Sequence, residues 1–253
     1  MIVALRQVIW IITFLVISSA AKTQIVNVEG KRNAGNQQGL HGSLDLNFNF
    51  TRNLQDVLTY GGKTNLQYLY GHHRVLFLAD LSRVQAGGAD FVNQGFEHVR
   101  YNYSFGIKDR FALEVFQQAQ FNSVQLIGFR HLTGAGLRFS PIDQDSIKLW
   151  CGTLPMFEYE ELTTDAIERN IRQSSYLLLF LTLKKFEFQS ITYYQPKWGD
   201  WSDYRLSTSN TLEFGILKWL RYALTMDLLY DSKVPEGVPA TVFTIKNGLR
   251  LEF

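Results

Sequence analysis

The alternation of apolar and polar residues is the main signal in this chain, and it is clearest at the C-terminal end. Positions 243, 245, 249, 251 and 253 are apolar, while 244, 246, 250 and 252 are polar. The stretches 220–231 and 204–216 show the same period of two. Because successive side chains of a strand point to opposite faces, this pattern predicts strands with one apolar and one polar face.

Weaker forms of the pattern precede these three stretches and bring the predicted strands to twelve. They lie near 40–51, 54–70, 75–82, 93–104, 111–120, 126–139, 147–156, 171–183 and 186–195. The three clearest strands have about 11–14 residues, against ~5–6 in soluble sheets and ~9–11 for a tilted strand that crosses a bilayer. Lipid offers no hydrogen-bond partners, so an open sheet edge is not tolerated there. The sequence therefore predicts an all-β fold, a closed antiparallel up-and-down transmembrane β-barrel of about 12 strands.

The connections between the predicted strands differ in length, which favours the same architecture. Short turns are predicted near 71–73, 106–109, 141–144, 184–185 and 218–219, and longer loops near 83–92, 157–170, 196–203 and 232–240. Two connections do not follow this difference in length. The first, around Arg52 and Asn53, is short, and the third outer loop is of medium length. Short turns on one side and long loops on the other are typical of outer-membrane barrels.

The N-terminal segment has the features of an export signal. Arg6 precedes an apolar stretch over 8–17, and Ser19 and Ala21 fit the −3 and −1 positions of a cleavage site. We therefore expect a cleaved signal peptide over 1–21, a polar lead-in over 22–38 and a barrel domain over 39–253. An uncleaved N-terminal anchor is the alternative. The expected location is the outer membrane of a Gram-negative-type bacterium.

The polar face of the predicted barrel carries charges of both signs. The candidates for lumen-facing residues are Arg205, Glu213, Arg221, Asp227, Asp231, Lys246, Arg250 and Glu252. Two interpretations remain open at this point. One is a narrow or filled lumen in a protein with a structural or envelope-stress role, and the other is a channel or binding barrel for a small hydrophilic solute. Twelve strands lie between the filled barrels of ~8 strands and the open porins of ~16–18.

Aromatic residues make up 14% of the chain and gather near the predicted interfaces. Trp198, Trp201 and Tyr204 lie beside one outer loop, and Trp219 lies at an inner turn. Indole and phenol rings at both ends of the strands are typical of the aromatic girdles of membrane barrels. Aromatic residues packed beside turns on a soluble surface are the alternative.

Charge and cysteine content narrow the range of functions. Lys and Arg number 25 and Asp and Glu 23, so there is no charge excess that would indicate nucleic-acid binding. Cys151 is the single cysteine, which excludes a disulfide within the chain and a zinc site of several thiolates. Since Cys151 alternates with Ile147 and Leu149, we expect it on the lipid-facing side.

Catalytic patterns are weak, and we expect neither catalytic residues, a cofactor nor a metal. The sequence has no G-x-S-x-G, H-E-x-x-H, Walker or Rossmann motif. An outer-membrane lipid hydrolase that uses His41, Ser43 and His98 is the weakest of the alternatives, because their positions show no nucleophile–base arrangement. The acidic run Glu158, Glu160, Glu161 and Asp165 is interpreted as a solvated loop face.

Several segments together resemble one known family. They are SITYYQP at 190–196, DYR at 203–205, YDSKVPEGVP at 230–239, KNGLRLEF at 246–253, FVNQGFEHVRYNY at 91–103 and GAGLRFSP at 134–141. The set is similar to the salt-stress-induced outer-membrane proteins, also called domain of unknown function 481, over most of residues 40–253. The resemblance implies an outer-membrane barrel but no catalytic residues, since the family has no established activity. The final Phe253 resembles the terminal aromatic that barrel-assembly machinery reads, which implies this machinery as a partner beside outer-membrane lipid.

Overall fold

The period of two in the sequence corresponds to β-strands throughout the part of the chain that the structure describes. The computed structural model describes residues 38–52, 56–164, 166–217, 220–234 and 239–251. The strands are β1 (Gly39–Arg52), β2 (Asp56–Tyr70), β3 (His73–Ala86), β4 (Ala89–Phe105), β5 (Phe111–Asn122), β6 (Ile127–Asp143), β7 (Ile147–Leu162), β8 (Ile167–Leu183), β9 (Phe186–Lys197), β10 (Asp200–Leu217), β11 (Leu220–Asp231) and β12 (Thr241–Leu251). Two 3₁₀ turns, η2 (Ile107–Asp109) and η3 (Ser123–Gln125), lie in the connections. No helix in these ranges is long and apolar enough to cross a membrane.

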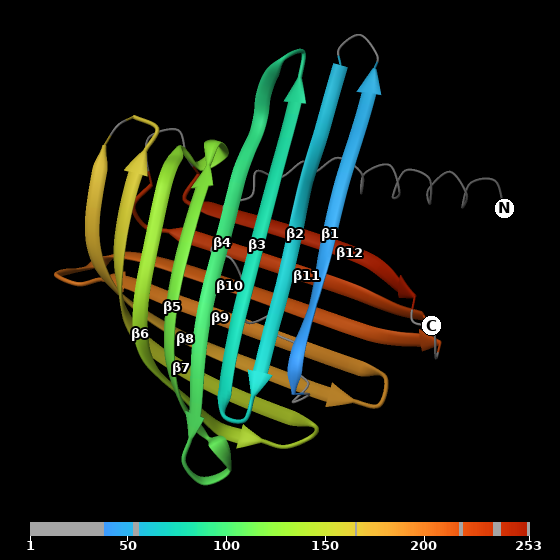
Figure 1. Ribbon diagram of the computed structural model, residues 1–253, viewed down its shortest axis with the longest axis vertical. Helices are drawn as coiled ribbons and strands as arrows, with labels where there is room; N and C mark the ends of the chain where they lie inside the picture. Colours follow the sequence, from blue (N-terminus) through green and yellow to red (C-terminus); the bar gives the residue numbers. More distant parts are fainter. Residues whose placement is uncertain (1–37, 53–55, 165, 218–219, 235–238, 252–253) are drawn as a thin grey trace, which may run out of the picture.

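All twelve strands belong to one antiparallel sheet in which each strand pairs with the next along the chain. The predicted all-β, up-and-down architecture is therefore confirmed. The sheet curls so strongly that β9–β12 pass behind β1–β4 and cross them at a steep angle (Figure 1). Within the described residues the pairing runs from β1 to β12 without a pairing between these two edge strands, and almost every side chain of β1 is exposed. Closure of the barrel thus stays a prediction.

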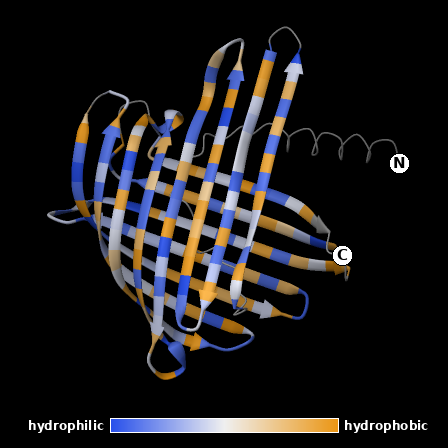
Figure 2. Ribbon diagram, in the orientation of Figure 1, coloured by the Kyte–Doolittle hydropathy of each residue, from blue (hydrophilic) through white to orange (hydrophobic). Residues whose placement is uncertain are grey.

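The two faces of the curled sheet differ in character. We call the concave face the inner face and the convex face the outer face. Bands of apolar and polar residues alternate along each strand (Figure 2). On the outer face apolar side chains are open to the surroundings, as for Leu46 at 77% and Phe48 at 75% exposure. On the inner face charged side chains such as Arg100, Glu114 and Glu158 are buried.

The two ends of the sheet are named after their connections. The β2–β3 end holds the start of β1 and the turns after β2, β4, β6, β8 and β10, and the β3–β4 end holds the others. The predicted contrast in loop length between these ends holds only for the connection between β11 and β12, which covers 232–240 as predicted. The other long loops that we expected at this end are short. Strand β3 continues to Ala86 and β4 begins at Ala89, while β9 ends at Lys197 and β10 begins at Asp200.

Cross-strand pairing of charges explains why β3 and β4 are longer than predicted. Arg83 of β3 donates two hydrogen bonds to the carboxylate of Asp90 of β4, at 3.0 and 2.7 Å. The polar character of Arg83 and Asp90 suggested a loop, but opposite charges on facing strands stabilise a hairpin. The strands therefore continue through stretches that we expected to be irregular. The predicted signal peptide, most of the lead-in and residue Asp165 lie outside the described residues.

The inner face also carries apolar residues, which the prediction of charged candidates did not include. Three buried apolar clusters lie on it, one of them formed by Tyr176, Leu178, Ile191 and Tyr193. Tyr176 and Leu178 belong to the stretch of β8 that is apolar on both faces in sequence. Packing against β9 places them inside and leaves Leu177 outside, where 49% of it is exposed.

Candidate functional site

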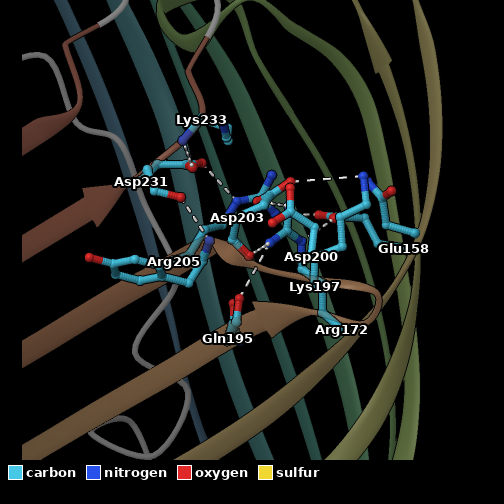
Figure 3. A network of polar contacts seen from close by, with 12 residues as sticks. Glu158, Arg172, Gln195, Lys197, Asp200, Asp203, Arg205, Asp231 and Lys233 are labelled. Atoms are coloured by element: carbon cyan, nitrogen blue, oxygen red, sulfur yellow. Dashed lines mark hydrogen bonds and ion pairs between the residues drawn. The ribbon is translucent and has the colours of Figure 1, made fainter.

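A network of buried charges fills the inner face toward the β3–β4 end (Figure 3). Glu158 of β7 lies at its centre and is fully buried. Arg172 of β8 donates from Nε to Glu158 Oε2 at 2.7 Å, and Arg205 of β10 donates from Nη1 to Glu158 Oε1. Glu160 accepts two hydrogen bonds from Arg130 of β6, at 2.8 and 2.9 Å. Guanidinium and carboxylate groups thus neutralise one another, which buried charges require.

The network crosses the interior instead of following one pair of strands. Arg205 reaches from β10 to β7 although β8 and β9 lie between them in the sheet, and its Nε also donates to Asp231 Oδ2 at 2.8 Å. Arg172 donates from Nη2 to Asp203 Oδ1 at 2.8 Å and from Nη1 to the carbonyl of Gln195 at 3.3 Å. Such contacts form only where the curled sheet brings distant strands within reach of one side chain. We call this set the Glu158 network; it comprises Arg130, Glu158, Glu160, Arg172, Asp203, Arg205 and Asp231.

A second group of buried polar residues lies nearer the β2–β3 end. Glu114 of β5 accepts from Asn102 Nδ2 at 2.6 Å and from the hydroxyl of Tyr176 at 2.7 Å. Arg138 and Arg100 approach the same carboxylate at 3.6 and 3.9 Å. Tyr176 belongs to β8, three strands from β5, so this contact also spans the interior. These five residues are called the Glu114 cluster.

A glycine makes room for the ring that completes the Glu114 cluster. Gly152 of β7 faces Tyr176 across the strand pair. A Cβ at Gly152 would lie 2.1 Å from the Tyr176 ring, which is impossible without movement. The absence of a side chain at this position therefore allows the tyrosine to lean across the lumen.

Two cavities border the Glu114 cluster, one on each side. A cavity of about 40 Å³ separates the Glu114 cluster from the Glu158 network and is lined by Arg100 and Tyr176 from the first and Arg130 and Arg205 from the second. Its volume suits a few water molecules. A larger cavity of about 280 Å³ lies at the β2–β3 end, with Arg138 among its lining residues. The Glu114 cluster contributes residues to both cavities and lies between them.

The residues that we predicted to face the lumen fall into three groups with distinct partners. Arg205 and Asp231 belong to the Glu158 network. Arg221 lies 3.3 Å from Glu213 and 2.9 Å from Glu187. A third pair joins Lys246 Nζ to Asp227 Oδ2 at 2.7 Å, and Ser209 donates to the other oxygen of Asp227 at 2.6 Å. The backbone of Arg250 pairs with that of Arg221, while Glu252 lies outside the described residues.

The interpretation of Glu158 and Glu160 as a solvated loop is wrong. Both lie in β7 on the inner face, with Glu158 0% and Glu160 6% exposed. The neighbouring residues Phe157 and Tyr159 point outward, so the period of two continues through this stretch. That alternation was the signal that sequence reasoning missed. Their arginine partners on β6 and β8 were also not predicted.

Aromatic rings form a belt on the outer face at each end of the sheet. At the β3–β4 end Tyr204 lies 5.7 Å from Tyr194 and 5.6 Å from Tyr230, measured between ring centroids. Trp198 and Trp201 lie at the same end and are exposed. Trp219, the predicted aromatic of the opposite end, lies outside the described residues.

The belt at the β2–β3 end is made by phenylalanines instead. Phe111 stacks between Phe105 and Phe139, with centroid distances of 5.9 and 5.0 Å. Tyr103 continues the row at 6.4 Å from Phe105. Aromatic rings therefore gather near both ends of the strands, where the apolar band of the outer face begins and ends.

The residues considered for a hydrolase do not come together. His41 and Ser43 lie on β1, and two strands separate them from His98 on β4. His98 is buried between Phe96 and Phe116, and its Nδ1 is 3.1 Å from Gln118 Oε1. Across the described ranges no group of three or more His, Cys, Asp or Glu residues is placed to hold a metal ion.

Comparison with known proteins identifies a family. A family model described as a protein of unknown function, DUF481, matches residues 45–253. A search of curated proteins gives no significant match. A solved structure of the NanC porin is similar with a TM-score of 0.48 and 11% sequence identity, and the match covers 77% of this chain and 94% of that chain.

Proposed function

The chain belongs to the DUF481 family of proteins of unknown function, and we propose that it is an integral outer-membrane barrel with a filled interior. The supporting observation is that apolar side chains face outward and charged side chains face inward, the reverse of the arrangement in a water-soluble protein. Large apolar side chains are exposed on the outer faces of strands from β1 to β12, whereas Arg172, Glu114 and Glu158 are buried inside. A monomer in water rarely exposes an apolar patch beyond a few hundred Å². Hydrocarbon around the outer face removes this conflict.

The spacing of the aromatic belts agrees with the thickness of a membrane. Phe129 at the β3–β4 end and Phe139 at the β2–β3 end are ten residues apart on β6. Ten residues of strand span ~33 Å, and a tilt of ~40° reduces this to ~25 Å along the membrane normal. The apolar band of an outer-membrane barrel is ~25 Å tall.

The filled interior supports a structural or envelope-stress role more than conduction. The Glu158 network and the Glu114 cluster together cover the inner face from β4 to β11, and the cavity between them holds only a few waters. Moving such a network aside would separate buried charges, which is costly. We therefore propose a non-enzymatic protein whose barrel does not carry a steady ion current.

Export and assembly complete the proposal. The segment 1–21 would direct the chain out of the cytoplasm and be removed, and Phe253 would be read by the barrel-assembly machinery. Outer-membrane lipid is then the main partner. Truncation of Phe253 tests the second step, because it should lower the amount of assembled protein in envelopes without changing its synthesis.

A planar-bilayer recording tests the closed lumen. We expect reconstituted protein to give no steady single-channel conductance, because charged side chains occupy the interior. A large and steady conductance would contradict the proposal. Alkaline carbonate extraction of the same preparation is the control for insertion, and release of the protein by carbonate would contradict the membrane location instead.

A further inference from the structure

The cavity at the β2–β3 end has a lining with an excess of positive charge. We call it the mouth cavity, and its volume is about 280 Å³. Four cationic residues line it, namely Arg74, Lys108, Arg110 and Arg138, against the two carboxylates of Asp109 and Asp143. Since low-dielectric walls focus the field of like charges in a cleft, this mouth attracts anions.

Both carboxylates of the mouth cavity are already engaged by other groups. Asp109 Oδ1 lies 3.0 Å from His72 Nδ1, and Asp143 Oδ1 lies 3.9 Å from Lys148 Nζ. In contrast, Lys108 and Arg110 are exposed and make no ion pair with a described residue. The carboxylates thus leave the cations at the rim available to a ligand.

The cations are held at two depths of the cavity. Lys108 and Arg110 lie at the rim, in and beside the turn η2, where Lys108 and Asp109 have the left-handed φ values of 57° and 54°. Such a conformation is uncommon for residues other than glycine. Deeper inside, the guanidinium carbon of Arg138 lies 4.8 Å above the ring of Trp150. Its Nη1 also lies 3.6 Å from Glu114 Oε1, so this guanidinium group joins the cavity wall to the Glu114 cluster.

The mouth cavity has a floor. Asn102 and Arg138 line the cavity and also belong to the Glu114 cluster, which lies beneath it on the inner face between β4 and β8. A solute that enters from this end therefore meets this cluster. The volume lies near the lower limit of ligand pockets, ~300 Å³, and so suits a small molecule.

We propose that the mouth cavity binds a small organic or inorganic anion through a carboxylate or phosphate group. Arginine recognises both groups with paired hydrogen bonds. The proposal goes beyond the structural role above. Binding at this site does not require that ions pass through the barrel. The proposed membrane location determines only which compartment the mouth cavity faces.

Isothermal titration of the full chain in detergent tests this proposal, with succinate and inorganic phosphate as the two probes. At low salt we expect at least one of them to bind, and the probe that binds shows which group the site accepts. The uncharged diol ethylene glycol should not bind. Absence of binding by both anions to folded protein would overturn the proposal.

A rim substitution makes the test specific. Arg110→Gln removes one cation from an exposed turn, so the fold should persist, and we expect affinity to fall ~10-fold for the loss of about 1.4 kcal/mol. Lys233→Gln removes a charge of the opposite end and should leave affinity unchanged. Equal affinity in Arg110→Gln and the parent protein, or an equal loss in Lys233→Gln, would assign binding to another place.

Discussion

Glu158 illustrates how the interior depends on single charged groups. Its carboxylate has Arg172, Arg205 and Arg130 within 3.5 Å, and no part of its side chain is exposed. Each guanidinium group has lost most of its hydration. The stability of the arrangement therefore rests on every member keeping its charge and its partners.

Replacing Glu158 by glutamine should be strongly destabilising. The amide keeps the shape but removes the negative charge, so Arg172 and Arg205 remain buried beside fewer carboxylates. We expect the free energy of unfolding in detergent to fall by about 3–5 kcal/mol. A urea titration measures it, with the difference in gel mobility between the folded and the heat-unfolded protein as the readout.

Glu161→Gln is the matched control for this substitution. Glu161 lies on the same strand but on the outer face, where its contact is a 3.4 Å bond from Tyr159. Removing the charge of Glu161 should change the free energy of unfolding by no more than about 0.5 kcal/mol. Equal effects of the two substitutions would show that the stability of the protein does not depend on the buried charge of Glu158.

Sequence reasoning located two of the seven residues of this network. Arg205 and Asp231 were predicted to face inward because they lie in strands with clear alternation. Their partner Glu158 was not, because it follows Pro155 in an acidic stretch that resembles a loop. A contact between β7 and β10 depends on the curvature of the whole sheet, which no local pattern encodes.

At the scale of the strands, the fit of β7 against β8 depends on Gly152. The Gly152→Ala variant should displace the ring of Tyr176 and break its bond to Glu114. We expect a loss of about 1–3 kcal/mol in unfolding free energy, typical of overpacking. Gly248→Ala on β12 is the control, since nothing lies within 4 Å of its added Cβ. If both alanines are equally tolerated, Tyr176 is free to move and does not hold the lumen closed.

The alternation along β1 leads to a test of which face meets lipid. We expect a cysteine at Leu46 to resist a membrane-impermeant maleimide in vesicles. A cysteine at Asn47 should react, because this side chain is exposed on the inner face and lies away from the networks of β4–β11. Both are made in a Cys151→Ser background, which removes the native thiol. Mass spectrometry measures labelling, and equal labelling of the two neighbours would contradict a bilayer around the outer face.

The existence of each strand was predictable because a period of two over many residues is a strong signal. The ends of the strands were not, because loops were inferred from polar residues such as Arg83 and Asp90. Whether polar residues form a loop or pair across a hairpin depends on the register of the partner strand. The register is fixed by the buried inner face, where a slip of one residue would expose every apolar and charged group of a strand to the wrong side.

For the whole molecule, the seam between β1 and β12 determines whether the sheet can lie in a membrane. In water an unpaired edge is tolerable, but in hydrocarbon each unpaired backbone group costs several kcal/mol. The proposed location therefore requires the two edges to meet. The two strands run in opposite directions, as an antiparallel pair at the seam requires.

Disulfide mapping in the Cys151→Ser background would test closure in the membrane. The pairings place Asn47 of β1 on the inner face, and on β12 Thr244, Lys246 and Gly248. A cysteine at Asn47 should therefore form a disulfide in vesicles with at least one of these three positions, because the Cα atoms of partners in a ladder come within ~4.5–5.5 Å. Ile245 lies on the outer face and is the control that should not react. If none of the three inner positions reacts while the protein resists carbonate extraction, the edges do not pair in lipid, and some other chain must cover them.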